Sequence, residues 1–317
     1  MTDFPRPTEE EVRSWLAALS NWGRWGPEDD LGTLNYIGAE ERVVAVQLAV
    51  DGRTVSCALP IAFEKHGSTT ADATSVGADR DWSRPERYVL QDASEAPSLE
   101  TRFPTYDAFL IAPHGPVITH LDAPRHTVLG GRSYNDLGAG AAGSRGTIES
   151  VSGGLLGRGV LLDVARSQGR PWLDDGDAIY PSDLERCEAE NGVRVGRGDL
   201  LFVRTGYRGR LPGGPSVRHA PRPGLHAACL PWLHERQVAV LLADTAIDVI
   251  PHGYEGLGLP IHTVGMWAMG LWLVDNCDLE RLSATTVEMG RSTFLALLAP
   301  LILTGGSASP VNPIAVF

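Results

Sequence analysis

One short stretch, His120–His126, constrains the fold most, because a strand must enter it and end within it. The β-branched residues just before it predict a strand over residues 117–121. Pro124 cannot donate to a sheet ladder, so the strand ends before this proline. Side chains at positions i and i+2 of a strand point to the same face. His120 and Asp122 therefore project together, as two ligands of one divalent ion would.

His126 follows Pro124 on the expected turn, where it is free to face the same pocket. There it would act as a third ligand or as a general base. The alternative is a surface His-x-Asp pair with an unrelated histidine nearby, because short clusters of these residues also arise by chance. Spacing alone leaves both interpretations open.

The stretch resembles the signature of the cyclase family of metal-dependent hydrolases, which includes bacterial kynurenine formamidase and isatin hydrolase. The family pattern is H-x-G-T-H-x-D-x-P-x-H, and five positions match it: Thr119, His120, Asp122, Pro124 and His126. Four further segments are similar to longer members of the family: Trp25–Asn35, Gly157–Val164, Gly198–Gly206 and Ser309–Ala315. The resemblance therefore covers most of the chain.

Two positions depart from the family pattern. Pro116 stands where the family has its leading histidine ligand, and Ile118 replaces a glycine. His114 lies two residues too early to be a simple substitute. The resemblance therefore implies a centre for a single ion, or a site rebuilt with His114.

The family supplies two later metal ligands, a histidine and a glutamate. His262 matches the histidine, and Asp275 stands in the place of the glutamate with a side chain one methylene shorter. The alternatives are a core histidine at 262 and a helix N-cap at Asp275, ahead of residues 279–282. Asp244 and Asp248 follow an apolar strand and are candidates for positions behind the ligands.

The order of elements by itself supports an α/β or α+β fold. Thr8 begins a capping box with Glu11 ahead of apolar residues at helical spacing, which predicts a first helix. Helices are expected at residues 9–19, 39–50, 181–191, 224–235 and 293–298. Strands are expected at residues 54–59, 108–111, 117–121, 160–164, 200–204 and 238–243.

The resemblance narrows the fold to a swivelling β/β/α architecture with a β-barrel-like core and outer helices. We expect one cyclase-like domain over residues 1–317, with an N-terminal helical segment at 1–50. Residues 66–101 are polar and poor in apolar anchors, which predicts a long loop or an arm ordered against a partner subunit. A homodimer or homotetramer is therefore expected.

The composition narrows the function classes. A net charge of −12 makes nucleic acids and anionic membranes unfavourable partners, and no apolar run is long enough to span a bilayer. The N-terminus lacks the order of a secretory signal. The four cysteines are scattered without C-x-x-C spacing, as in reduced, buried thiols of a cytoplasmic protein.

These observations predict a metal-dependent hydrolase that cleaves a C–N or C–O bond of a small cyclic or acylated substrate, such as an amide, lactam or lactone. His120, Asp122, His262 and Asp275 would hold Zn²⁺ or Mn²⁺, ions that suit nitrogen and oxygen ligands. His126 would move the proton. Three residues are candidates for contact with the substrate: His114, Trp25 and Trp82. The alternatives are a polyketide-type ring cyclase or dehydratase, and a non-catalytic binding homologue.

Overall fold

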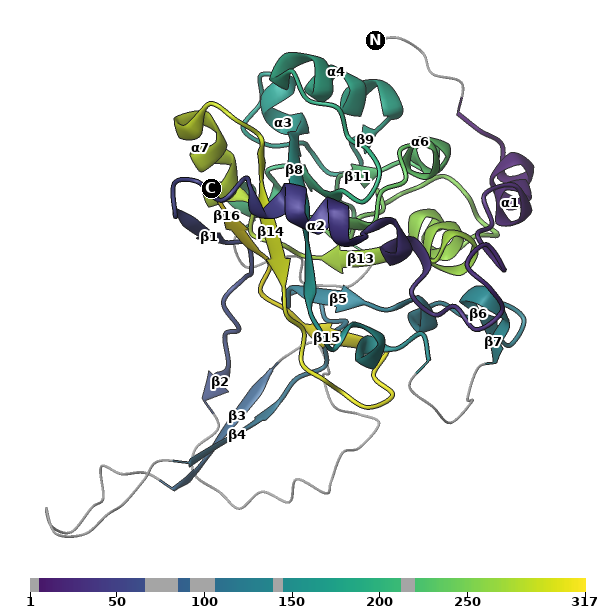
Figure 1. Ribbon diagram of the computed structural model, residues 1–317, viewed down its shortest axis with the longest axis horizontal. Coiled ribbons are helices and arrows are strands. Elements are labelled where there is room, and N and C mark those ends of the chain that lie inside the picture. The colour runs from purple at the N-terminus through teal and green to yellow at the C-terminus, as the bar shows by residue number, and fades with distance from the viewer. Residues whose placement is uncertain (1–5, 66–84, 92–105, 139–144, 212–219) are drawn as a thin grey trace, which may run out of the picture.

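The computed structural model describes residues 6–65, 85–91, 106–138, 145–211 and 220–317. Its centre is a nine-stranded mixed sheet in the order β1-β16-β14-β8-β10-β12-β13-β5-β15. The sheet curls into a half-barrel with helices packed outside it (Figure 1). The predicted fold class, an α/β architecture with a barrel-like core and outer helices, is confirmed.

The central sheet contains, in chain order, β1 (Thr54–Ser56), β5 (His120–Asp122), β8 (Leu155–Asp163), β10 (Leu200–Arg204), β12 (Val240–Ala243), β13 (Trp272–Asp275), β14 (Thr293–Leu298), β15 (Ala308–Pro310) and β16 (Ile314–Val316). The four middle strands β8, β10, β12 and β13 run parallel, and the strands on both sides of them pair antiparallel. The carboxyl ends of the parallel strands therefore meet at one edge, where polar side chains from different strands come together.

Both faces of the parallel strands are buried, which explains their nearly continuous apolar sequences. On β10, Leu201 and Val203 belong to one core cluster, and Leu200 and Phe202 belong to the other. The first cluster is covered by α1, α4, α6 and η6, and the second includes residues of the flanking strands β14 and β16. The sheet is thus held rigidly from both sides.

The helical segments surround this sheet: α1 (Glu9–Ala18), η1 (Gly32–Tyr36), α2 (Ala39–Val46), η3 (Pro124–His126), η4 (Tyr134–Asp136), η5 (Ile148–Val151), α3 (Val164–Ser167), α4 (Pro181–Asn191), α5 (Tyr207–Arg210), α6 (Cys229–Glu235), η6 (Ile261–Met269) and α7 (Glu280–Met289). Seven short strands form smaller sheets: β2 (Glu64–Lys65), β3 (Glu86–Gln91), β4 (Tyr106–Leu110), β6 (Arg132–Ser133), β7 (Leu137–Gly138), β9 (Ala178–Ile179) and β11 (Gly224–Leu225). The element η6 is a π-helix, a form that often occurs at functional sites.

Most expected elements are present. The capping box of Thr8 and Glu11 begins α1, and α4 and β10 have the predicted bounds. The second helix ends at Val46 rather than at residue 50. Helix α6 covers only the second half of residues 224–235, because Gly224–Leu225 pairs with β9.

The helix predicted at residues 293–298 is wrong, because this segment is strand β14. Its Leu and Ala residues favour a helix in isolation, but the segment pairs with β8 on one side and β16 on the other. Phe294 is fully buried between the rings of Phe202 and Phe317. Tertiary pairing therefore overrides the local helical preference.

No described helix is long and apolar enough to cross a membrane. All four cysteines are free and buried, as their scattered positions predicted. The interpretation of residues 1–317 as one domain stays a prediction.

A small three-stranded sheet, β2-β3-β4, projects from the rest of the protein (Figure 1). It includes part of the predicted arm; the remainder of residues 66–101, with Trp82, lies outside the described residues. Tyr106 and Phe109 on β4 are 53% and 56% exposed, although aromatic side chains are stabilised by burial. A narrow projecting sheet with exposed aromatic residues is what an arm that packs on a partner subunit requires.

We therefore expect a homo-oligomer, most simply a dimer, in solution. Light scattering should give a mass of at least twice the 34.0 kDa of one chain. Replacing Tyr106 and Phe109 together by serine should shift this mass toward the monomer, whereas the same change at exposed Val43 and Val44 on α2 serves as the control. A mass near 34.0 kDa at all concentrations of the unaltered protein would contradict the expectation.

Candidate metal centre

The site begins with the pairing of two short strands. Strand β5 lies antiparallel to β13 in a register that places His120 directly opposite Asp275. Directly opposed residues have Cβ atoms about 5 Å apart, and Asp122 projects to the same face as His120 because it is two residues further along the strand. One ligand atom from each of these three residues lies within 4.8 Å of the others. The register alone therefore assembles three donors.

The ring of His120 is held in one orientation by the backbone. Its Nδ1 lies 2.9 Å from the carbonyl oxygen of Ile118, so Nδ1 donates and Nε2 is left as the acceptor. Nε2 lies 3.6 Å from Oδ1 of Asp122. A histidine held in this way presents its lone pair toward the carboxylates, as a metal ligand does.

His262 is oriented by a carboxylate that lies behind it. Asp248 accepts hydrogen bonds from the backbone of Ile261 at 2.7 Å and from Nδ1 of His262 at 2.7 Å. Nε2 of His262 then lies 3.5 Å from Oδ2 of Asp275. Asp248 thus stabilises the start of the π-helix and orients His262. It lies behind a predicted ligand, a position for which the sequence had made it a candidate.

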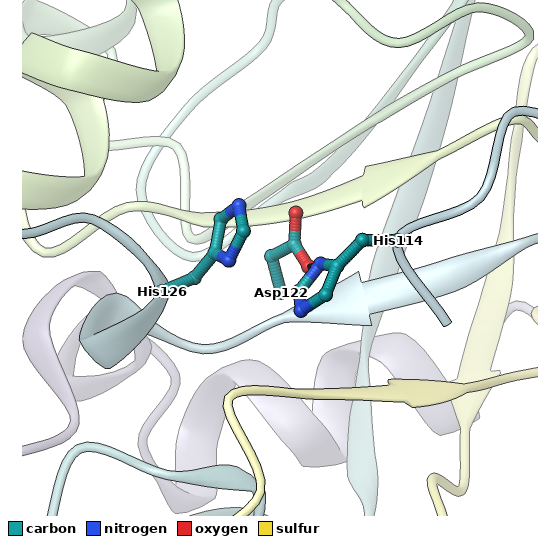
Figure 2. A group of neighbouring side chains, drawn as sticks. All are labelled: His114, Asp122 and His126. Atoms are coloured by element: carbon teal, nitrogen blue, oxygen red, sulfur yellow. Dashed lines mark ion pairs between the residues drawn. The ribbon is translucent and has the colours of Figure 1, made fainter. Parts of the chain in front are cut away.

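Two more histidines approach Asp122 from outside the strand. Figure 2 shows His114 and His126 converging on this carboxylate, one from the segment before β5 and the other from the turn η3 after it. Nδ1 of His114 lies 3.0 Å from Oδ1 of Asp122, and the rings of His114 and His126 stack with centroids 4.1 Å apart. Ligand atoms of these three residues also lie within 4.8 Å of one another. His114 therefore takes part in the site in spite of its displaced sequence position.

All six predicted histidines and aspartates line one cavity of about 60 Å³: His114, His120, Asp122, His126, His262 and Asp275. A volume of this size holds an ion with a few water molecules. Within it, Oδ1 of Asp275 is buried without a hydrogen-bond partner among the described residues, and the buried Oδ1 of Asp122 is met by imidazole nitrogens of His114 at 3.0 Å and of His120 at 3.6 Å. Buried carboxylate oxygens without partners are costly unless a cation or a donor meets them. The donor set, nitrogen and oxygen only, fits a divalent ion such as zinc or manganese.

The shorter side chain of Asp275 still reaches the other donors, because β13 and β5 are adjacent strands. Asp275 ends β13 and does not cap a helix; the next helix, α7, begins at Glu280. Asp122 belongs to both groups of three donors, so it is the centre of the arrangement.

The charges of these groups depend on one another. Burial opposes ionisation of Asp122, but His120, His114 and His126 outweigh it and hold the pKa of this carboxyl below its usual range. Burial likewise opposes protonation of His262, but Asp275 and Asp248 raise its pKa well above the usual value. A divalent ion would therefore have to displace a proton from His262.

His126 behaves differently. Burial lowers its pKa to about 4, against the opposing effect of Asp122. Its imidazole is therefore neutral at pH 7 and offers a lone pair, as both a ligand and a general base must.

The predicted contact of Trp25 with the substrate stays a prediction. This residue does not line the cavity, and its ring packs edge-on against Tyr36 at 5.2 Å with Arg24 alongside. The loop that carries it packs against other parts of the protein, so Trp25 serves packing. Trp82 lies outside the described residues.

Sequence reasoning missed several cavity residues. Arg208, Thr245 and Asn276 all line the cavity and are buried. Arg208 follows the end of β10, and Thr245 and Asn276 follow the ends of β12 and β13. Their position just after parallel strands is the one signal that could have indicated them.

Comparisons with known proteins agree with this geometry. A family model described as "Putative cyclase" matches residues 55–248. A search of curated proteins found no match. A solved structure described as a novel cyclase is 30% identical, has a TM-score of 0.81, and the match covers 95% of this chain and 99% of that one.

More distant structures share the fold. Isatin hydrolase A from Labrenzia aggregata is 16% identical, with a TM-score of 0.57 and coverage of 83% of this chain and 93% of that one. A predicted metal-dependent hydrolase from Bacillus stearothermophilus is 18% identical, with a TM-score of 0.50 and coverage of 83% and 97%. Because the family model matches well over half of the chain and a relative of 30% identity spans nearly all of it, the protein belongs to the putative cyclase family, whose fold is also that of isatin hydrolase.

Proposed function

We propose that this protein is a metal-dependent hydrolase that cleaves a C–N or C–O bond of a small cyclic or acylated substrate. The observation that carries the proposal is the pair of buried carboxylates of Asp122 and Asp275, the second with an oxygen that has no hydrogen-bond partner among the described residues, in one cavity with the imidazoles of His120 and His262. Relatives of the same fold are described as isatin hydrolase and as a metal-dependent hydrolase. An amide, lactam or lactone is the substrate type that suits such a site.

His120, Asp122 and Asp275 would hold the ion together with His262, whose Nε2 lies 3.5 Å from Oδ2 of Asp275 although it belongs to neither group of three donors; His114 is close enough to replace one of them. A divalent ion bound there would polarise a carbonyl group and lower the pKa of water. Asp248 and the Ile118 carbonyl keep the two imidazoles aimed at the ion by accepting their Nδ1 protons. The protein thus supplies a fixed set of donors rather than one that must rearrange.

His126 would take a proton from water and return it to the leaving group. Its ring lies parallel to that of His114, with an angle of 19° between their planes, so its direction is fixed. It comes from η3 rather than from β5, because Pro124 ends the strand and begins the turn. The turn therefore separates the proton-transfer residue from the strand ligands.

The reaction class can be tested by isotope labelling. Metal-loaded protein would be incubated with a panel of cyclic amides, formamides and lactones in oxygen-18 water. Hydrolysis places one labelled oxygen in the carboxylate product of each substrate that turns over. Ring closure, the second candidate because the family model is described as that of a cyclase, would release product without label. Metal-dependent binding without turnover across the panel would instead identify a binding protein.

The metal content gives a second test. We expect close to one divalent ion per chain. The ion should be lost in His120→Ala and in Asp122→Ala, because both residues belong to the group of three donors that also contains Asp275. His252→Ala is a matched control, since this histidine does not line the cavity. Elemental analysis after preparation with Zn²⁺ or Mn²⁺ measures the content. Full metal content in both cavity variants would remove these residues from the site.

His126→Ala separates proton transfer from metal binding. We expect this variant to keep the ion, because four other donors remain, and to lose about 10²–10⁴-fold in rate, as is usual for general acid–base catalysis. The loss should appear in kcat more than in KM, because proton transfer matters in the transition state. Metal analysis and steady-state kinetics on one substrate measure both. Loss of the ion would make His126 a ligand, and an unchanged rate would refute its proposed role.

A further inference from the structure

A buried arginine faces the candidate metal centre. Arg208 lies on α5, just after β10, and only 4% of its surface is exposed. It lines the same cavity as Asp122 and Asp275. Arginine is rarely this deeply buried unless its charge is paired, so the groups around the guanidinium are informative.

Every hydrogen-bond partner of Arg208 is a neutral oxygen. Nε donates to the backbone oxygen of Asp244 at 3.1 Å, and Nη2 donates to Oδ1 of Asn276 at 2.8 Å and to the backbone oxygen of Pro116 at 3.1 Å. The nearby carboxylate of Asp244 is engaged elsewhere, because it accepts from the backbone and hydroxyl of Thr205 and from the backbone of Gly206. No carboxylate of the described residues forms an ion pair with Arg208.

Other arginines of this protein are paired. Arg158 binds the carboxylate of Asp199 at 2.7 Å, and Arg204 binds those of Asp163 and Glu280 at 2.9 Å and 2.7 Å. Nη1 of Arg208 is buried and has no hydrogen-bond partner in the described part of the chain; Nη1 of Arg236 is in the same state, but Arg236 is paired with Glu188 at 3.0 Å, whereas Arg208 has no such ion pair. A buried cationic donor left unpaired is strongly unfavourable, and a bound anion would remove that cost.

We propose that Arg208 binds a carboxylate group of the small molecule that occupies the metal cavity. A guanidinium is a strong hydrogen-bond donor to a carboxylate, and Nη1, the one nitrogen of Arg208 without a partner in the described part of the chain, supplies the donor protons. A second buried arginine, Arg222, lines the same cavity and adds positive charge there. The anion that fills this site is either a carboxylate that the substrate carries or the one formed when the scissile bond is hydrolysed.

Asn276 links this anion site to the candidate metal centre. Its Oδ1 accepts from Arg208, and its Nδ2 donates at 3.3 Å to the carbonyl oxygen of Ile118. The same carbonyl accepts from Nδ1 of His120. One asparagine therefore fixes the guanidinium relative to a proposed metal ligand, so a carboxylate on Arg208 lies beside the reacting group.

The carboxylate has two possible sources. It is carried by the substrate from the start, or it is formed when water adds to the scissile carbonyl, the C–N or C–O bond breaks and a proton passes to the leaving atom. The second source, and any role of Arg208 in catalysis, rest on the proposed hydrolase function. The binding of an anion by Arg208 does not rest on that function, so anion binding and catalysis are tested separately.

The binding test uses acetate and its neutral analogue acetamide with metal-loaded protein. Acetate should raise the temperature of thermal unfolding in a saturable way, beyond sodium chloride of equal ionic strength, and acetamide should not. Arg208→Gln should weaken the apparent acetate affinity by about tenfold or more, because a charged hydrogen-bond donor is lost. Arg208→Lys should retain part of it, because the positive charge stays while the Nη1 donor is lost.

Arg158→Gln is the control. It also removes one positive charge from a partly buried arginine, but Arg158 does not line the cavity. Its acetate response should equal that of the unaltered protein. Metal analysis of every variant shows whether the centre is intact. Equal acetate responses in the unaltered protein, Arg208→Gln and Arg208→Lys, all with the ion bound, would overturn the proposal. If Arg208→Gln does not fold, Arg208→Lys decides alone: an unchanged response overturns the proposal, and a weakened one supports it.

A kinetic comparison separates the two sources of the carboxylate. The substrates are 2-formamidobenzoate, which carries a carboxylate beside its formamide, and formanilide, which lacks one. A fall in kcat/KM of Arg208→Gln for the first alone supports a substrate carboxylate; an equal fall for both supports the anion formed at the scissile carbonyl. If the unaltered protein hydrolyses neither substrate, the hydrolase proposal loses support, while the acetate experiment still decides the role of Arg208.

Discussion

The pairing of β5 with β13 is the constraint on which the candidate site depends. Strand β5 has only three residues, yet all are buried, and it lies between β13 and β15. This register sets His120 against Asp275. A slip by one residue would turn His120 and Asp122 to the opposite face and separate them from Asp275. The buried core on both faces of the sheet prevents such a slip, so packing far from the cavity determines the position of its donors.

Ionisable side chains are concentrated in the cavity beside this pair of strands. Two carboxylates and four imidazoles face one small cavity, while Asp248 stands behind one imidazole and Arg208 stands at the wall. Several of these polar groups lack partners, although buried polar atoms in folded proteins are almost always satisfied. The concentration of unpaired atoms in one cavity distinguishes it from the paired clusters elsewhere, such as the one around Arg204. This concentration supports the proposed binding of an ion and an anion in the cavity.

Asn276 and Thr119 connect the site to the sheet. Asn276 has a left-handed backbone with φ of 59°, a conformation that asparagine tolerates better than most residues. Its carbonyl accepts a 2.6 Å hydrogen bond from the hydroxyl of Thr119, and its side chain reaches Arg208. The turn after β13 therefore joins the strand that carries His120 to the helix that carries Arg208. The matched threonine of the family pattern thus has a structural role here.

The amino-acid sequence alone predicted a strand at His120, the capped helix at Glu9 and the family resemblance, because these depend on local spacing and on residue type. The strand is His120–Asp122 rather than 117–121, and the β-branched residues 117–119 that suggested it lie outside it. The sequence also indicated His262 and Asp275, although they lie far along the chain. It did not predict the packing of Trp25 against Tyr36, the strand at residues 293–298 or the buried charge of Arg208. Each of these depends on which segments become neighbours: a strand partner, a packed ring or an unpaired guanidinium exists only once the chain has folded.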